Sequence, residues 1–324
     1  MAPLELLKSF HPCEYPAEFL AARLRGKKNG LFCDWETILA GGNITERLRN
    51  TPFYPYLREH GPVGVYRFLQ HDHLWVYTRM NNRLRCWFKA YFSWHELNTL
   101  IVCLRSFAGT ENNTNLPPLL QHSLLHDAIQ NILAGSGNFT DALQELDTFF
   151  ASSAPADVGL CAGYETGGMQ GLETLLRNLF WESFLCRKQP LLLKTFFRHL
   201  VDFYNTITLA KSIRWRIETE PQLLPGGMVP LERFRKAFRL RDLAPLLRPL
   251  RLQMTGGDPP AGPGLETLLL KSIGARLKKY SRQRTETGDI LFYLWEQYRS
   301  NRNVSLVLNA AFAGEKRLQK GLVL

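Results

Sequence analysis

The sequence predicts an all-α protein made of three related helical units, and three observations support this prediction. Apolar residues recur at helical spacing along most of the chain, strand patterns are nearly absent, and one stretch is written three times. The clearest copy runs from Gly171 to Arg216, another begins at Gly264, and a weaker one begins at Gly64. Because a repeat determines the whole architecture, we give it more weight than any single helix.

Each copy leads from its opening glycine to an asparagine: Asn98, Asn205 and Asn303. The interval is 34 positions in the first two copies and 39 in the third. The outer two asparagines are followed nine positions later by Phe-Ala-Gly, whereas the middle copy has Arg214–Arg216, an Arg-Trp-Arg sequence, at that place. We expect each asparagine near the start of an amphipathic helix, where it caps backbone N–H groups or bonds to a neighbouring helix. Chance resemblance between Leu-rich helices is the alternative explanation of the repeat.

Apolar spacing places the helices along the chain. The first is expected over residues 18–32, where Phe19, Leu20 and Leu24 form one stripe behind Pro16. Residues 71–77 alone could form a strand, but the corresponding parts of the other copies have helical patterns. Further helices are expected over residues 65–92, 95–107, 119–150 with a break at 135–137, 171–216, a stretch that follows the turn at 224–227 and has Pro230 near its start, and the third copy.

Two stretches rich in polar residues, glycine or proline, Gly109–Pro118 and Thr255–Gly264, are expected to be linkers. A third stretch, Ser152–Gly171, is rich in small residues and is expected to be a loop. These breaks divide the chain into three predicted helical domains, residues 1–110, 111–220 and 221–324.

Composition limits the class of protein and of partner. The 324 residues carry a net charge of +11 with a pI near 9.5, which favours an acidic partner, a membrane face or nucleic acid. The six cysteines contain no CxxC pair, so buried free thiols and a reducing compartment are expected. We expect neither a signal peptide nor a membrane span, because no apolar run of that kind occurs. The protein is therefore expected to be soluble or peripheral to a membrane.

A search for catalytic and cofactor motifs finds none complete. The Gly26-Lys27-Lys28 stretch lacks the first glycine and the Ser or Thr of a phosphate loop, and His95-Glu96 lacks the second histidine of a zinc helix. We therefore expect no catalytic, cofactor or metal residues. One alternative remains open, a metal-dependent enzyme that uses His122 and His126, which would lie one turn apart on a helix.

A second alternative is a basic helical-repeat protein that binds nucleic acid. Arginines alternate with aromatic residues from Arg79 to Phe92, which suits the stacking of single-stranded bases. We favour instead a packed amphipathic helix whose arginines extend along it to solvent, because no known RNA or DNA module is visible.

Five motifs carry a family resemblance, and they occur in the expected order along nearly the whole chain. They are YPAEFLAARLRGKKNGLF, TPFYPYL, DFYNTITLAKSIR, LLPGGM and RNVSLVLNAAFAGEKRLQKGLV, which begin at Tyr15, Thr51, Asp202, Leu223 and Arg302. The chain thereby resembles the C/d subunit of V-type and A-type rotary ATPases. The Arg-Trp-Arg sequence of the middle copy and the Pro/Gly-rich second linker depart from the pattern, which leaves room for a divergent paralogue.

The resemblance implies a funnel-like fold of three helical bundles in pseudo-threefold arrangement. It implies a non-catalytic rotor subunit that joins the proteolipid ring of the membrane to the central shaft, on the cytoplasmic face, without a small-molecule substrate or cofactor. Basic residues are the candidates for partner contact. They are Arg23, Arg25, Lys27 and Lys28 near the N-terminus, Arg105, Lys211 and Arg214 after the asparagines, and Lys316, Arg317 and Lys320 near the C-terminus.

Overall fold

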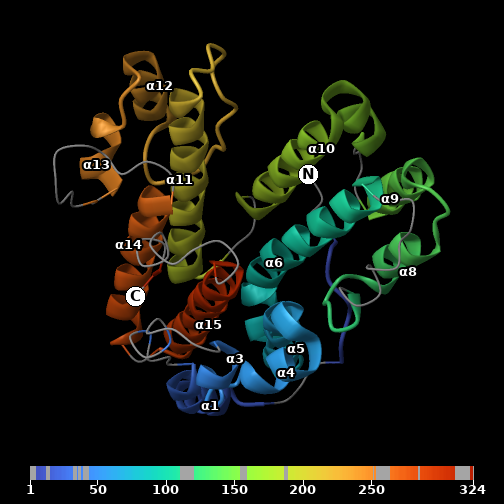
Figure 1. Ribbon diagram of the computed structural model, residues 1–324, viewed down its shortest axis with the longest axis vertical. Coiled ribbons are helices and arrows are strands. Elements are labelled where there is room, and N and C mark those ends of the chain that lie inside the picture. The colour runs from blue at the N-terminus through green and yellow to red at the C-terminus, as the bar shows by residue number, and fades with distance from the viewer. Residues whose placement is uncertain are drawn as a thin grey trace. The chain divides into compact units, whose positions relative to one another are not determined.

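The computed structural model describes residues 5–11, 15–31, 35, 38, 44–109, 120–153, 159–185, 189–250, 252, 263–283, 285–310 and 322–323. Over these ranges the protein is all-helical, and the one β-type contact is an isolated antiparallel bridge between Leu7 and Leu125 (Figure 1). The predicted all-α class is confirmed. None of the described helices combines the length and the apolar character that a bilayer span requires.

The helices follow one another with short connections. They are α1 (Ala17–Gly30), α3 (Ile44–Arg47), α4 (Tyr54–His60), the 3-10 turn η1 (Gly61–Val63), α5 (Gly64–Thr78), α6 (Asn82–Gly109), α8 (Asp127–Gly135), α9 (Phe139–Ser153), α10 (Leu160–Leu185), α11 (Leu191–Arg214), α12 (Leu231–Leu240), α13 (Ala244–Leu250), α14 (Pro263–Ser281) and α15 (Glu286–Ala310).

The chain folds into two compact units. Unit 1 comprises Met1–Tyr15 and Gln70–Lys188, and unit 2 comprises Pro16–Leu69 and Gln189–Leu324. Unit 2 is thus assembled from two separate parts of the chain, and one boundary falls between α10 and α11. The three-domain division stays a prediction, and its linkers lie largely outside the described residues.

Unit 2 is built around α15. Helix α1 packs along α15, α14 lies beside both α15 and α11, and α12 packs on the far part of α11 (Figure 1). The expected stripe of α1 is confirmed for Leu20 and Leu24, which are fully buried, whereas Phe19 is 51% exposed. Trp295 fills the middle of α15, and Gly274 of α14 approaches its indole so closely that an added Cβ would lie 3.0 Å from Nε1.

Unit 1 is built around α6, whose side chains from Phe88 to Phe107 are mostly buried. Helices α9 and α10 pack on α6, and α8 packs on α9. Edge-to-face contacts of Tyr91 and Phe92 with neighbouring rings fill the core of this unit.

Two expectations about secondary structure in unit 1 were wrong. Residues 120–126, predicted as helix, form a turn and an extended segment, because their backbone bonds to the N-terminal segment and to Glu96 instead of to itself. The predicted loop over Ser152–Gly171 is helical from Leu160 onward, with a kink at Gly168, where φ is 58°. Only glycine adopts that angle without strain, so the small residues there permit a bend within a helix.

The repeat asparagines lie well inside long helices, so their expected place near a helix start was wrong. Their expected bonding to a neighbouring segment is confirmed in two copies. The Asn205 amide donates to the Leu224 carbonyl at 2.8 Å and accepts from the Leu224 N–H at 2.8 Å. Asn303 makes the same pair of bonds with Val323, at 3.1 and 3.0 Å. The Asn98 amide donates to Trp94 of its own helix at 3.0 Å.

We refer to each two-bond contact between an asparagine amide and the backbone of one later residue as an asparagine clamp. Both clamps reach a residue at nearly the same separation in sequence, 19 positions for Asn205 and 20 for Asn303. Each side chain therefore replaces the partner that an adjacent strand would supply, and it holds a non-helical segment against the side of a helix.

Replacing Asn205 or Asn303 by alanine should lower the free energy of unfolding by about 1–3 kcal/mol, because a backbone N–H and C=O each lose their partner. Asn98→Ala is the matched control, and it should cost less than about 1 kcal/mol, since the Trp94 carbonyl already belongs to a helix. Denaturant unfolding measures all three variants. Equal losses at the three positions would contradict the role of the clamps.

Candidate functional site

The predicted N-terminal basic cluster divides into two pairs on α1. Arg25 and Lys28 line a groove of about 490 Å³ in unit 2, between the end of α1, the end of α14 and the first turns of α15. Arg23 and Lys27 lie on the same helix but do not line this groove, and both are exposed. A volume of this size is typical of ligand and side-chain binding sites.

The groove has a basic rim and a partly aromatic floor. Arg25 lies 3.7 Å from the carboxylate of Asp289, and the Lys28 ammonium lies 4.8 Å from the ring centre of Phe292. Arg282, at the end of α14, supplies a third cation. The three cations face one carboxylate, so the groove favours an acidic group from a partner.

Sequence reasoning missed Arg282 as a site residue. It lies 254 positions after Lys28, and only the packing of α1 along α15 brings the two to one groove. The one available indication was the basic run at the end of the third copy's first helix, which includes Lys278 and Lys279.

The other predicted partner residues are scattered. Arg105 on α6 is bonded to Glu173 of α10, through two hydrogen bonds of which the NH2 to Oε2 one is 2.7 Å long. This pair stays within unit 1, although the Arg105 side chain is 60% exposed. Lys211 and Arg214 are exposed in the last turn of α11. The C-terminal candidates Lys316, Arg317 and Lys320 lie outside the described residues.

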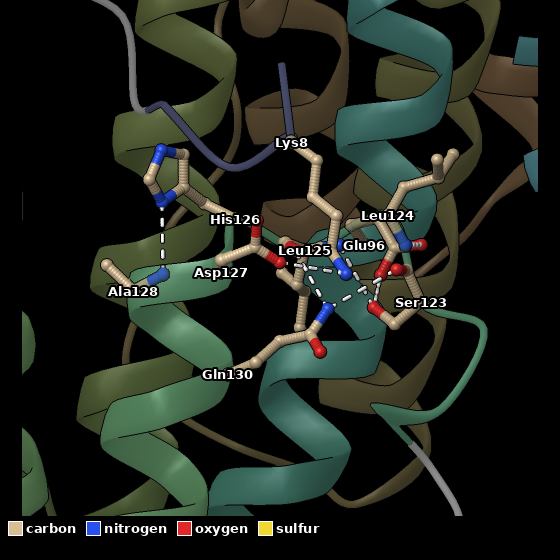
Figure 2. Close-up of polar contacts among 9 residues, drawn as sticks. All are labelled: Lys8, Glu96, Ser123, Leu124, Leu125, His126, Asp127, Ala128 and Gln130. Carbon is tan, nitrogen blue, oxygen red and sulfur yellow. Dashed lines mark hydrogen bonds and ion pairs between the residues drawn. The ribbon is translucent and has the colours of Figure 1, made fainter. Parts of the chain in front are cut away.

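A buried carboxylate organises the polar centre of unit 1 (Figure 2). Glu96 of α6 accepts a hydrogen bond from the Ser123 hydroxyl at 2.6 Å and from the Leu124 N–H at 2.8 Å. Burial raises the pKa of Glu96, whereas these hydrogen bonds and the nearby Lys8 charge act to lower it. The carboxylate fixes the extended segment that sequence reasoning took for helix.

The N-terminal segment closes this centre from outside. The Lys8 N–H donates to the Leu124 carbonyl at 2.8 Å, and the His126 N–H donates to the Leu6 carbonyl at 2.8 Å. The Lys8 ammonium lies 3.0 Å from the carboxylate of Asp127, as Figure 2 shows. This arrangement holds a chain segment in place, and its groups are occupied with one another.

A second buried carboxylate lies in unit 2, one turn before Asn205. Asp202 accepts hydrogen bonds from the N–H groups of Met228 and Val229, both at 3.1 Å. Gly227 packs so tightly against this carboxylate that any side chain there would collide with it. Burial raises the pKa of Asp202 to about 6, opposed by the two N–H donors and the charges of Arg198 and Arg276. Asp202 and Asn205 together hold the Leu224–Gly227 turn to α11.

The histidines of the metal alternative do not share a helical turn. His122 lies in a turn against His71, with ring centres 5.7 Å apart, and His126 caps α8 by accepting from the Ala128 N–H at 3.2 Å. Across the described ranges, no group of three or more His, Cys, Asp or Glu side chains could hold a metal ion.

The arginines of the nucleic-acid alternative contact their own aromatic neighbours. The Arg79 guanidinium lies 4.6 Å from the Trp75 ring centre, and that of Arg83 lies 5.0 Å from Trp87. Arg85 is buried and donates to three backbone carbonyls, those of Phe10, Tyr77 and Thr78. These contacts agree with a packed helix whose arginines cover their own aromatic rings.

The cysteines divide between buried and exposed positions. Cys103 is buried, and burial raises the pKa of its thiol to about 12, so it remains protonated and unreactive. Cys86 is exposed, contrary to the expectation that the thiols are buried.

Comparison with known proteins finds no family model that matches this chain and no curated protein that resembles it.

The raised pKa of Asp202 predicts that stability falls as pH rises. From about pH 4 to about pH 6 the folded state retains a proton that the unfolded state has released, so deprotonation favours unfolding. Asp202→Asn should flatten this part of the curve of melting temperature against pH. Glu165→Gln, at an exposed position, should leave the curve unchanged. A curve for Asp202→Asn that is parallel to wild type would contradict the assignment.

Proposed function

We propose that this protein is a non-catalytic rotor subunit of a V/A-type ATPase, peripheral to the cytoplasmic face of a membrane. It couples the central shaft to the proteolipid ring for ion transport. The observation that carries the proposal is the recurrence of the asparagine clamp at the equivalent asparagines of α11 and α15. This recurrence supports the internal repeat, and the repeat together with the ordered motifs supports the family resemblance.

In this proposal the three units form similar helical bundles in pseudo-threefold arrangement around a funnel. A rotor subunit must transmit torque without yielding. Long helices suit that task, since α6 with its 28 residues is roughly 40 Å long. The clamps and the buried carboxylates Glu96 and Asp202 add bonds between helices and the adjoining segments, which oppose sliding of one past the other.

The groove beside Arg25, Lys28 and Arg282 is the proposed contact for an acidic surface of the shaft or ring. Its cations lie at the rim and are partly solvated, so they are expected to affect association rate and salt dependence more than final affinity. Single alanine substitutions should therefore have small effects, and reversal of several charges is the informative change.

Reversing the groove with Lys28→Glu and Arg282→Glu should release the water-soluble head from the membrane, because the groove then repels an acidic partner. Retained head subunits and ATP-driven ion pumping would be measured on membranes from cells that carry the variant as their sole copy. Circular dichroism of the isolated variant should show an unchanged fold.

The matched control is Arg23→Glu with Lys27→Glu, which makes the same charge change on α1 outside the groove. The control should retain most head subunits. Equal retention by the two double variants would remove the assignment of the groove. Normal pumping in cells that lack the protein would remove the rotor proposal itself.

The proposal also predicts that the purified protein neither hydrolyses ATP nor binds it tightly, since the sequence holds no phosphate loop. Phosphate release and equilibrium dialysis would test this. Hydrolysis that survives repurification and disappears in Lys27→Ala would contradict the non-catalytic assignment.

A further inference from the structure

Helices α11 and α12 end in the same way, and this shared ending is unusual. At the end of α11, the Arg216 N–H bonds to the Ile213 carbonyl at 3.1 Å and the Ile217 N–H to the Ser212 carbonyl at 2.9 Å. At the end of α12, the Arg241 N–H bonds to the Phe238 carbonyl at 3.0 Å and the Asp242 N–H to the Ala237 carbonyl at 3.1 Å. This is the Schellman pattern of helix termination.

Both endings place an arginine where glycine is the usual residue. Arg216 has a φ of 52° and Arg241 a φ of 54°, and no other non-glycine residue in the described ranges has positive φ. A side chain in this left-handed region strains the backbone, and such positions concentrate at functional sites. Two arginines kept at strained positions indicate that their charge is used.

Each strained arginine follows an exposed apolar side chain. Trp215 is 64% exposed and Leu240 is 57% exposed. The Arg241 guanidinium donates to the Ile217 carbonyl at 2.6 Å, which ties the two helix ends to each other within unit 2. We call this surface the helix-end patch. Its residues are Lys211, Arg214, Trp215, Arg216, Lys236, Arg239, Leu240 and Arg241, all exposed.

The patch coincides with the departure from the repeat pattern. Arg214 stands where the first copy has Phe107, and Phe107 is buried with only 6% exposure. The middle copy has therefore exchanged a buried Phe-Ala-Gly ending for an exposed Arg-Trp-Arg ending. A core requirement cannot explain this exchange, because the new side chains are outside the core.

We propose that the helix-end patch binds the surface of an anionic membrane, with Trp215 and Leu240 inserted at the level of the lipid headgroups. Six cations lie around these two apolar side chains, which matches a negatively charged surface. Tryptophan beside basic residues is typical of membrane interfaces. Both apolar groups project from helix ends, so a soft headgroup layer accommodates them, whereas a protein partner would need a matching pocket for each.

This inference goes beyond the proposed rotor function and can be tested apart from it, because lipid vesicles contain no ring or shaft. The full chain would be sedimented with vesicles of phosphatidylcholine alone and of phosphatidylcholine with phosphatidylserine. We expect binding to the anionic vesicles only, weakened by salt. Brominated lipid should quench tryptophan fluorescence in the wild type, and most of that quenching should be lost in Trp215→Phe.

Three variants separate a membrane role from a structural one. Arg216→Gly removes both the strain and one charge, so it should keep or raise the melting temperature while it weakens vesicle binding by about fivefold. Trp215→Ala with Leu240→Ala should weaken binding further. Leu191→Ala removes a side chain that is 79% exposed at the other end of α11 and should leave binding unchanged.

Equal binding to neutral and anionic vesicles, or no binding to either, would overturn the proposal. Binding that is the same in Arg216→Gly as in wild type would also overturn it. An acidic protein partner is a distinct outcome: the patch would then bind polyglutamate in a Trp215-dependent way and leave the vesicles in solution.

Discussion

The clamp between an asparagine amide and the backbone of one later residue is the interaction on which unit 2 depends. Asn205 and Asn303 each satisfy a backbone N–H and C=O that no helix or strand would otherwise satisfy. The clamp fixes Leu224, and Asp202 fixes the two residues after Gly227. Together they determine where α12 begins and therefore where it lies against α11. The groove and the helix-end patch both belong to the unit that these bonds organise.

Unit 1 solves the same problem with a carboxylate. Glu96 lies two positions before the repeat asparagine Asn98 and satisfies Ser123 and Leu124 on an extended segment. In both units a buried polar side chain on a long helix holds a connecting segment by its backbone. Carboxylates serve as acceptors only, whereas an asparagine also donates, so the asparagine clamp determines the position of its partner more narrowly. The weaker sequence pattern of the first copy agrees with this difference in chemistry.

Helical periodicity was sufficient to predict the all-α class and the beginning of most helices. It failed where a tertiary contact overrode local preference. Residues 120–126 have helical spacing, yet Glu96 and the N-terminal segment capture their backbone. The small residues before Gly171 looked like a loop, because composition alone does not distinguish a kinked helix from one. Arg25 and Lys28 were predicted as contact residues, but Arg282 was missed, because no local pattern relates residues 254 positions apart.

The order of chain parts in the two units has a consequence during synthesis. All of unit 1 except one fifteen-residue piece comes from a single stretch, which ends at Lys188. Helix α1 belongs to unit 2, and its main partner α15 begins only at Glu286. At a translation rate of about 5–20 residues per second, the apolar stripe of α1 waits on the order of 15–50 seconds for the helix that covers it. Unit 1 can therefore complete its core on the ribosome, whereas α1 remains exposed there until the end of the chain has been made.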